Sequence, residues 1–206
     1  MVVIEFVLLA LVGYFVGNFN IAIFISKKLN NDITKVGSGN PGSMNMLRNF
    51  GIKYGMITLI FDMLKGVIPS LLGLLLLGEV GLYVGGVAVV FGHIFPVFHN
   101  FKGGKGVAST TGVMLVANPI LTFILFALMM YSIYLFKYGS LSTLLYILII
   151  TVTEICLVQS ANWVNYILIS IIFILVYFAH RSNIKRLLTG KEVKTEFKKN
   201  GIIKID

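Results

Sequence analysis

The sequence predicts an all-α fold, a polytopic bundle of about seven transmembrane helices, and two properties of the chain support this prediction. Hydrophobic residues make up 57% of the 206 positions and charged residues only 12%, and the mean hydropathy is +0.93. A water-soluble globule of this size needs more polar surface, so the composition favours an integral membrane protein. Apolar runs long enough to cross a bilayer also recur along the chain. We therefore expect one membrane-embedded domain over residues 1–206, with a short basic tail over about 181–206.

The first apolar run, "MVVIEFVLLALVGYFVGNFNIAIFIS", predicts a retained span over residues 4–26. It has no basic start and it carries Glu5. Lysines follow it where a signal peptide would have a small-residue cleavage site. The single cysteine, Cys156, lies in a later apolar run, so an intrachain disulfide is excluded.

The remaining spans follow from the length of the apolar runs. Crossing a hydrocarbon core of roughly 30 Å takes about 20 helical residues. Runs suited to this lie over 55–77, 82–98, 140–157 and 162–180. The run over 107–136 is too long for one span, and Asn118-Pro119 interrupts it, because proline lacks a backbone donor and disfavours helix in the residue before it. We therefore expect a short segment over 107–117, either a span or re-entrant, and a full span over 119–136.

The basic residues predict the orientation, because lysine and arginine collect in cytoplasmic loops. Seven spans with an outside N-terminus place every basic loop and the basic tail on the cytoplasmic side. The opposite loops, 78–81 and 158–162, contain no lysine or arginine. If residues 107–136 formed a single span, the basic C-terminal tail would instead lie outside. We expect a multi-pass protein of the cell (inner or plasma) membrane whose polar loops face the cytoplasm. The basic loop residues are Lys27, Lys28, Lys35, Arg48, Lys53, Lys102, Lys105 and Lys137.

The first polar loop, "VGSGNPGSMNMLR" over 36–48, has the composition of an anion site. Its glycines allow backbone N–H groups to turn toward one point, and short polar side chains add donors. Arg48 supplies a cation ten residues after Ser38. An ordinary flexible connection between spans is the alternative.

The second polar loop, "GHIFPVFHNFKGGKGVAS" over 92–109, is similar to a nucleotide-binding P-loop but is not one. A P-loop needs glycine five residues before its Gly-Lys pair and serine or threonine directly after it. His99 and Gly106 occupy those positions. Glycines beside Lys102 and Lys105, and a helix expected to begin at Val107, still favour an anion. The alternative is that both lysines only mark the cytoplasmic side.

The third polar segment, "AHRSNIKRLLTGKE" over 179–192, leaves the last span. On a continuing helix His180 and Asn183 share a face, whereas Arg181, Lys185 and Arg186 occupy other faces. Taken alone, the histidine fits an ordinary interfacial residue, and the basic run fits a site for anionic head groups.

Ionisable residues inside the spans are few. Asp62 and Lys65 are three residues apart, and we expect a buried structural ion pair beneath the polar loops. His93, His99 and His180 lack metal-ligand spacing, so we predict neither a metal nor a cofactor. We expect no nucleic-acid partner. Together the polar segments instead indicate a small anionic, phosphorylated ligand at the cytoplasmic surface.

The three polar segments, in this order on successive cytoplasmic loops, closely resemble the bacterial acyl-phosphate:glycerol-3-phosphate acyltransferase family, the PlsY family. The resemblance covers about residues 25–195. It implies an enzyme that moves a fatty acyl group from acyl phosphate to the sn-1 hydroxyl of glycerol 3-phosphate, giving lysophosphatidic acid, the first step of phospholipid synthesis. The implied partners are both substrates, membrane lipids and, as a candidate, the enzyme that makes the acyl phosphate.

The resemblance, read together with the residue chemistry, gives three groups of candidate site residues. The catalytic candidates are Ser38, Arg48, Lys105, His180 and Asn183. The candidates for binding substrate phosphate are Gly39, Asn40, Gly42, Asn45, Lys102, Gly103, Gly104 and Gly106. The supporting candidates are His93, Asp62, Lys65 and Glu192.

Two stretches depart from the family pattern. Met44 stands where the family usually has threonine, so Ser43 becomes the candidate to supply the missing hydroxyl. The stretch "GNFNIAIFIS" over 17–26 lacks the family's proline-containing turn.

The chemistry does not require a strong base. An acyl phosphate has a good leaving group, so positioning the alcohol and stabilising the departing phosphate can suffice. The His-x-x-x-x-Asp pair of acyl-CoA-dependent glycerolipid acyltransferases is absent, because Phe98, Gly104 and Lys185 lie five residues after the three histidines. We expect the catalytic candidates to hold two phosphates side by side, the substrate's own phosphate to accept the hydroxyl proton, and the acyl chain to lie between spans. His180 as general base is the competing hypothesis.

Two other functions stay open from the sequence. A small anion or phosphate-ester transporter would also combine apolar spans with basic loops, but it should show internal repeats and several polar intramembrane residues. We find no repeat and few such residues, namely Asp62, Lys65 and Glu154. The other alternative is a non-catalytic scaffold whose basic tail recruits lipid-synthesis partners.

Overall fold

The computed structural model describes residues 2–158 and 162–195. Within them every regular element is helical, which confirms the all-α class. The elements are α1 (Val2–Asn18), α2 (Ile21–Lys28), α3 (Ser43–Phe50), α4 (Ile52–Ile94), the short 3-10 helix η1 (Val97–His99), α5 (Val107–Ala117), α6 (Pro119–Phe136), α7 (Gly139–Leu157), α8 (Trp163–Ala179) and α9 (Arg181–Leu188).

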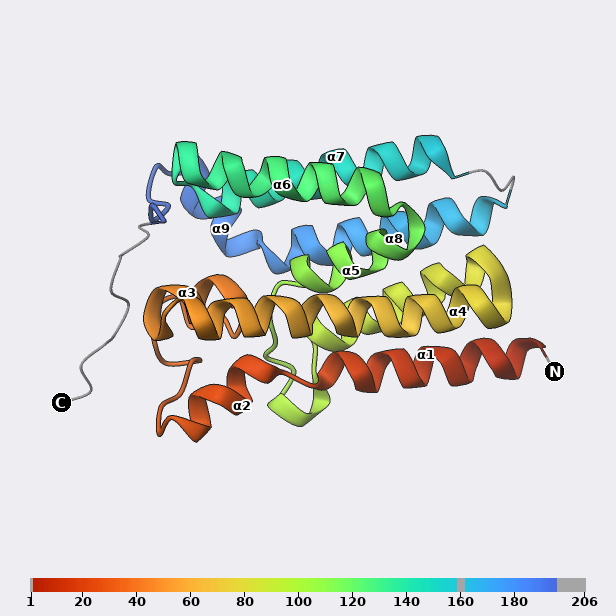
Figure 1. Ribbon diagram of the computed structural model, residues 1–206, viewed down its shortest axis with the longest axis horizontal. Helices are drawn as coiled ribbons and strands as arrows, with labels where there is room; N and C mark the ends of the chain where they lie inside the picture. The colour runs from red at the N-terminus through yellow and green to blue at the C-terminus, as the bar shows by residue number, and fades with distance from the viewer. Residues whose placement is uncertain (1, 159–161, 196–206) are drawn as a thin grey trace.

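The long helices run along one axis and form a layered bundle (Figure 1). In this view α6 and α7 form one outer layer, α5 and α8 the middle, and α4 and α1 the opposite side. The short helices α2, α3 and α9 gather at one end, and α1 begins at the other end. The first and third polar segments are therefore brought to the same end of the bundle.

α4 contains two predicted spans joined by a turn. Gly78 has φ 68° and ψ −158° inside the helix, and the chain folds back there (Figure 1). The arms touch through small residues: a Cβ on Gly73 would collide with the carbonyl oxygen of Gly81. The second arm ends at Ile94, earlier than the predicted 98, because Pro96 disfavours helix in the residue before it.

The first predicted span, 4–26, lies within an apolar segment long enough to cross a membrane, Val2–Lys28, but the segment is divided into two helices. α1 ends at Asn18, and Asn20 begins α2 by accepting a hydrogen bond from the Ile23 N–H at 3.1 Å. Two asparagines in an apolar run offer side-chain hydrogen bonds that compete with the helix. The interruption leaves the carbonyl groups of Gly17 and Phe19 available to Lys65.

Four apolar segments are long enough to cross a membrane: Val2–Lys28, Ile52–His99, Pro119–Phe136 and Gly139–Leu157. A fifth is added if α8 and α9, bent by 59° relative to each other, form one broken span. α5 has 11 residues and extends about 16 Å, about half of the hydrocarbon core. A polytopic helical membrane fold is confirmed, while seven spans and an outside N-terminus stay predictions.

α5 begins inside the bundle, because it packs directly on the first arm of α4 (Figure 1). A Cβ on Gly66 would collide with the Ser109 carbonyl oxygen, and one on Gly112 would collide with that of Met63. Such close backbone contact needs small residues. It fixes the start of α5 next to the polar end of the bundle, where the candidate site lies.

Candidate active site

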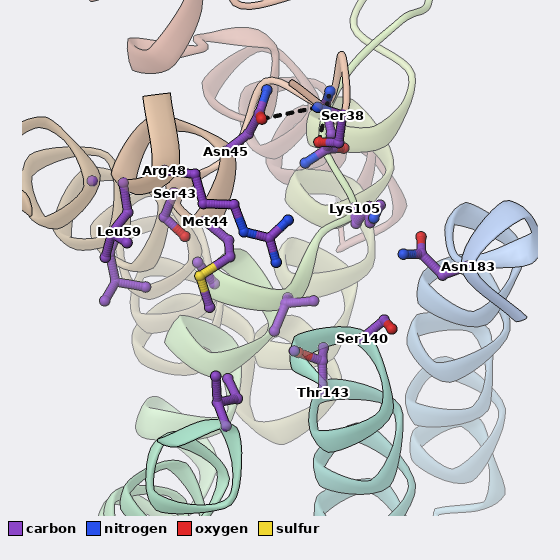
Figure 2. Close-up of a pocket in the computed structure, with 18 of the residues that line it drawn as sticks. Ser38, Ser43, Met44, Asn45, Arg48, Leu59, Lys105, Ser140, Thr143 and Asn183 are labelled. Carbon is purple, nitrogen blue, oxygen red and sulfur yellow. Dashed lines mark hydrogen bonds between the residues drawn. The ribbon is translucent and has the colours of Figure 1, made fainter. Parts of the chain in front are cut away.

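A cavity of about 680 Å³ lies among α3, α4, the start of α5, α6, α7 and α9. All three polar segments line it. Figure 2 shows residues that line it on α3, α7 and α9 and before α5. The candidates that line it are Ser38, Asn40, Gly42, Asn45, Arg48, Asp62, His93, Lys105, Gly106, His180, Asn183 and Glu192.

The first polar loop is held in shape by Asn45. Its Oδ1 accepts a hydrogen bond from the Ser38 N–H at 3.1 Å, drawn in Figure 2. Its Nδ2 donates to the carbonyl oxygens of Val36 at 2.9 Å and Ile33 at 3.3 Å. Both amide hydrogens are thus used inside the protein. Asn45 lines the cavity, but its side chain organises the loop that carries Ser38.

Arg48 projects from the last turn of α3 into the cavity (Figure 2). Its Nη2 donates to Thr195 Oγ1 at 2.6 Å. Its Nε is buried and has no hydrogen-bond partner among the described residues. Burial lowers the pKa of the guanidinium from its ordinary value, although the group stays charged at neutral pH. Arg48 therefore keeps donors for an anion.

Lys105 lies just before α5 and contributes a second cation. Burial, with repulsion from Arg186 and Arg48, lowers the pKa of its ammonium to about 8, although Glu192 opposes this change. Several cations around one cavity destabilise each other until an anion neutralises them. This charge arrangement favours a multiply charged ligand such as a phosphate.

The start of α5 adds backbone donors. Gly106 precedes the helix at φ 81°, a left-handed conformation suited to glycine. The first N–H groups of a helix have no intrahelical acceptor, and here Val107 and Ala108 line the cavity. The predicted helix start at Val107 is confirmed, and it suits an anion.

The third polar segment is not a continuing helix, because the chain bends between α8 and α9 at His180. The His180 Nδ1–H donates to the Val176 carbonyl oxygen at 2.8 Å. Both His180 and Asn183 are buried and line the cavity, as expected. The prediction that Arg186 occupies another face is wrong, because Arg186 also lines the cavity.

Glu192 holds the side chains of this segment together. Its Oε1 accepts from Asn183 Nδ2 at 2.8 Å, and its Oε2 accepts from Arg186 Nε at 2.7 Å. Burial alone would raise the pKa of the Glu192 carboxyl, but hydrogen bonds from side chains that include Asn183 and Arg186 lower it overall. The carboxylate fixes these two side chains at the edge of the cavity.

The glycines of the second polar loop are used differently from the prediction. The Gly103 N–H donates to the Ile94 carbonyl oxygen at 3.2 Å, and the Gly104 N–H donates to that of His93 at 3.1 Å. These two donors dock the loop on the end of α4. They are therefore already satisfied within the protein.

Some predicted phosphate-binding residues lie outside the main cavity. Gly39, Lys102 and Gly103 line a second hollow of about 390 Å³, together with Lys27 and His99. Neighbouring residues of the first polar loop thus face different cavities. Gly39 lines the second hollow, whereas Ser38 and Asn40 on either side of it line the main cavity.

The predicted ion pair beneath the site is confirmed. Lys65 Nζ lies 2.8 Å from Asp62 Oδ1, and it also donates to the carbonyl oxygens of Phe19 at 3.0 Å and Gly17 at 3.4 Å. One carboxylate oxygen and two carbonyl oxygens thus lie close to the ammonium. His93 Nδ1 lies 3.8 Å from the same Asp62 oxygen.

A sequence model of the family described as glycerol-3-phosphate acyltransferase matches residues 7–190. The chain belongs to this acyltransferase family. Proteins named glycerol-3-phosphate acyltransferase include one from Finegoldia magna, 40% identical over 91% of this chain and 95% of the relative. Another, from Thermoanaerobacter sp., is 41% identical over 91% of this chain and 94% of the relative.

Solved structures agree with the family assignment. The crystal structure of PlsY, an integral membrane glycerol 3-phosphate acyltransferase, in its glycerol 3-phosphate form has a TM-score of 0.87 and 32% identity, and the match covers 93% of this chain and 96% of that chain. Its lysophosphatidic acid form has a TM-score of 0.83 and 33% identity, over 94% of this chain and 96% of that chain. This acyltransferase is therefore an integral membrane enzyme.

The structure adds cavity-lining residues that sequence reasoning missed. Ser140 and Thr143 line the cavity from the first turns of α7 (Figure 2). The sequence could have indicated both residues, because polar residues three apart at the start of an apolar span share a helix face. Thr195 binds Arg48, yet nothing in the local sequence distinguishes it. Ser43 and Met44 both line the cavity, so a hydroxyl is present beside the substituted position.

Replacing Lys102 with alanine is expected to have a small effect on this acyltransferase. Its side chain is exposed and lines the second hollow, so we expect kcat/KM for glycerol 3-phosphate to fall by less than about fivefold. The measurement is steady-state kinetics in detergent, with Lys105→Ala as the matched comparison. An equal loss for both variants would contradict the placement of Lys102 outside the main cavity.

Proposed function

We propose that this glycerol-3-phosphate acyltransferase uses acyl phosphate as its donor and works in the cell membrane with its site facing the cytoplasm. The glycerol 3-phosphate sn-1 oxygen attacks the acyl carbonyl carbon, the bond from that carbon to the phosphate oxygen breaks, and lysophosphatidic acid and inorganic phosphate form. The observation that carries this proposal is one cavity with a cationic end and an apolar wall.

The cationic end suits two phosphates. Arg48, Lys105 and Arg186 all line it, and the start of α5 adds backbone donors. One phosphate belongs to glycerol 3-phosphate and the other departs from the donor. Cations already in place stabilise the charge that develops on the leaving phosphate at no reorganisation cost. Ser38 and Asn183 provide neutral hydrogen-bonding groups at the same end.

The apolar wall suits a fatty acyl chain. α6 contributes Phe126, Met129, Met130 and Ile133, and the first arm of α4 contributes Leu59 (Figure 2). Methionine side chains adapt to irregular and variable ligands. An acyl chain along this wall would bring its carbonyl carbon to the cationic end, where the alcohol is held.

Replacing His180 with glutamine tests how the hydroxyl proton is removed. The hydrogen bond to Val176 places the proton on Nδ1, so Nε2 carries the lone pair of the neutral ring. We propose that His180 binds substrate and that the substrate phosphate accepts the proton. Glutamine should then raise KM for glycerol 3-phosphate and keep most of kcat. Loss of the acidic limb of the kcat profile, with kcat reduced throughout, would support His180 as the base.

A donor assay tests the proposed reaction. Purified protein in detergent receives labelled glycerol 3-phosphate with either acyl phosphate or acyl-CoA, and we expect labelled lysophosphatidic acid only with acyl phosphate. Product from acyl-CoA alone would overturn the choice of donor. No product from either donor would overturn the proposed reaction.

We also propose seven membrane segments with an outside N-terminus. The α4 hairpin supports this count, because each arm corresponds to one predicted span. Impermeant maleimide labelling in spheroplasts, on a Cys156→Ser background, tests it: Asn162→Cys should label from outside, and Lys191→Cys only after lysis. The reverse pattern would overturn the orientation.

A further inference from the structure

Gly104 lies against the imidazole ring of His93. A Cβ added to Gly104 would collide with Nε2 of that ring, and its nearest neighbours would all be ring atoms. His93 is 4% exposed, and it belongs to the last turn of α4. A glycine is needed at position 104 because a side chain occupies the space, which is a different requirement from close approach to a phosphate.

The other side of the ring faces the buried ion pair. His93 Nδ1 faces Asp62 Oδ1 at 3.8 Å, and Asp62 is paired with Lys65 at 2.8 Å. Lys65 is tied in turn to the carbonyl oxygens of Gly17 and Phe19 between α1 and α2. A chain of contacts therefore runs from the α1–α2 junction to the ring on which Gly104 rests.

The backbone joins the same contact to the phosphate site. The Gly104 N–H donates to the His93 carbonyl oxygen at 3.1 Å, so both the ring and the backbone of His93 hold this residue. Lys105 follows directly and lines the main cavity (Figure 2). A shift of Gly104 must therefore move the Cα of Lys105, from which its side chain extends.

We propose that His93 is a positioning residue: its buried ring, which lies beside the Asp62–Lys65 pair, contacts Gly104 and thereby sets where Lys105 presents its ammonium to the phosphate of glycerol 3-phosphate. This inference rests on the proposed function, in which Lys105 binds that phosphate. It assigns Gly104 to packing and assigns the phosphate contact to the next residue.

A suppressor experiment tests the proposal. Gly104→Ala should raise KM for glycerol 3-phosphate about tenfold or more, the effect of weakening a hydrogen bond to a charged group, with a smaller change in kcat. His93→Ala removes the ring that the new methyl group meets. The double variant His93→Ala/Gly104→Ala should therefore have a lower KM than Gly104→Ala, close to that of His93→Ala alone.

Gly103 supplies the matched control. A Cβ there would collide with the backbone carbonyl oxygen of His93, which the His93→Ala substitution leaves in place. Gly103→Ala should consequently show no recovery when combined with His93→Ala. If the Gly104 double variant also fails to recover, or if both glycine variants recover equally, the proposal is overturned.

His93→Ala alone keeps the proposal testable if Gly104→Ala does not fold. In the correctly folded fraction, isolated by size-exclusion chromatography, it should raise KM for glycerol 3-phosphate and leave most of kcat. A purely structural role would reduce the yield or melting temperature without changing KM, and that result would refute the inference. Lys105→Ala distinguishes failure of the proposed function from failure of the positioning role. An unchanged KM in Lys105→Ala would contradict the proposed function. A raised KM in Lys105→Ala, together with normal kinetics in His93→Ala, would contradict only the positioning role of His93.

Discussion

Replacing Asp62 with alanine is expected to lower the free energy of unfolding by about 3–5 kcal/mol, because the variant leaves the buried Lys65 ammonium without its carboxylate. Asp62 is 3% exposed and Lys65 is 6% exposed, so the ammonium is largely shielded from bulk water. The two remaining carbonyl acceptors solvate the ammonium but do not neutralise it. Thermal or detergent denaturation of the purified protein measures the change.

Two comparisons test whether the unpaired buried charge causes this loss of stability. The Asp62→Ala/Lys65→Met double variant carries no unpaired buried charge and should regain much of the stability. The exposed pair of Lys35 and Asp32, 3.8 Å apart with 82% and 39% side-chain exposure, offers a matched control on the surface. Asp32→Ala should cost less than about 1 kcal/mol. Equal losses for the two aspartate variants would contradict the role of burial.

Activity of the wild-type enzyme is expected to fall above about pH 8 because Lys105 loses its charge, and Lys105→Ala is expected to lose about 100-fold or more in kcat/KM at neutral pH. Burial, with repulsion from Arg186 and Arg48, lowers the pKa of the ammonium to about 8, although Glu192 opposes this change. The charged form below that pH binds phosphate, and the neutral form above it does not. The second pKa of a phosphate monoester is about 6, so the substrate phosphate does not titrate around pH 8.

The pH dependence of kcat/KM for glycerol 3-phosphate measures this effect, because it reports on the free enzyme. Lys105→Arg should move the alkaline limb out of the measurable range, since a guanidinium stays charged there. Lys102→Ala should keep the wild-type limb. A wild-type profile that stays flat to about pH 9, or an unchanged limb in Lys105→Arg, would disprove the assignment.

Helix boundaries were predictable where the sequence marks them strongly. Pro119 separates α5 from α6 at the predicted position, because a proline fits the first turn of a helix and disfavours helix before it. The interruption between α1 and α2 was not predicted, because hydropathy averages over a window and hides two asparagines among apolar neighbours. A long apolar run predicts that a segment lies in the membrane, but it does not predict whether that segment is one continuous helix.

The chemistry of the site was predictable, but the use of individual backbone groups was not. Arg48, Lys105, His180 and Asn183 were named from the family resemblance together with their residue chemistry, and all four line the main cavity. The role of Gly104 depends on where the His93 ring lies after folding. Adjacent glycines look alike in a sequence, and only their tertiary neighbours distinguish packing from ligand contact.

The hydrogen bond from Arg48 to Thr195 joins residues 147 positions apart, and the Thr195 N–H also donates to the Lys137 carbonyl oxygen. Glu192 and His180, on the same cavity, are likewise supplied after α8. During synthesis the ribosome delivers Ser38, Arg48 and Lys105 long before these partners. The cavity is therefore complete only once residues 180–195 have been added to the growing chain.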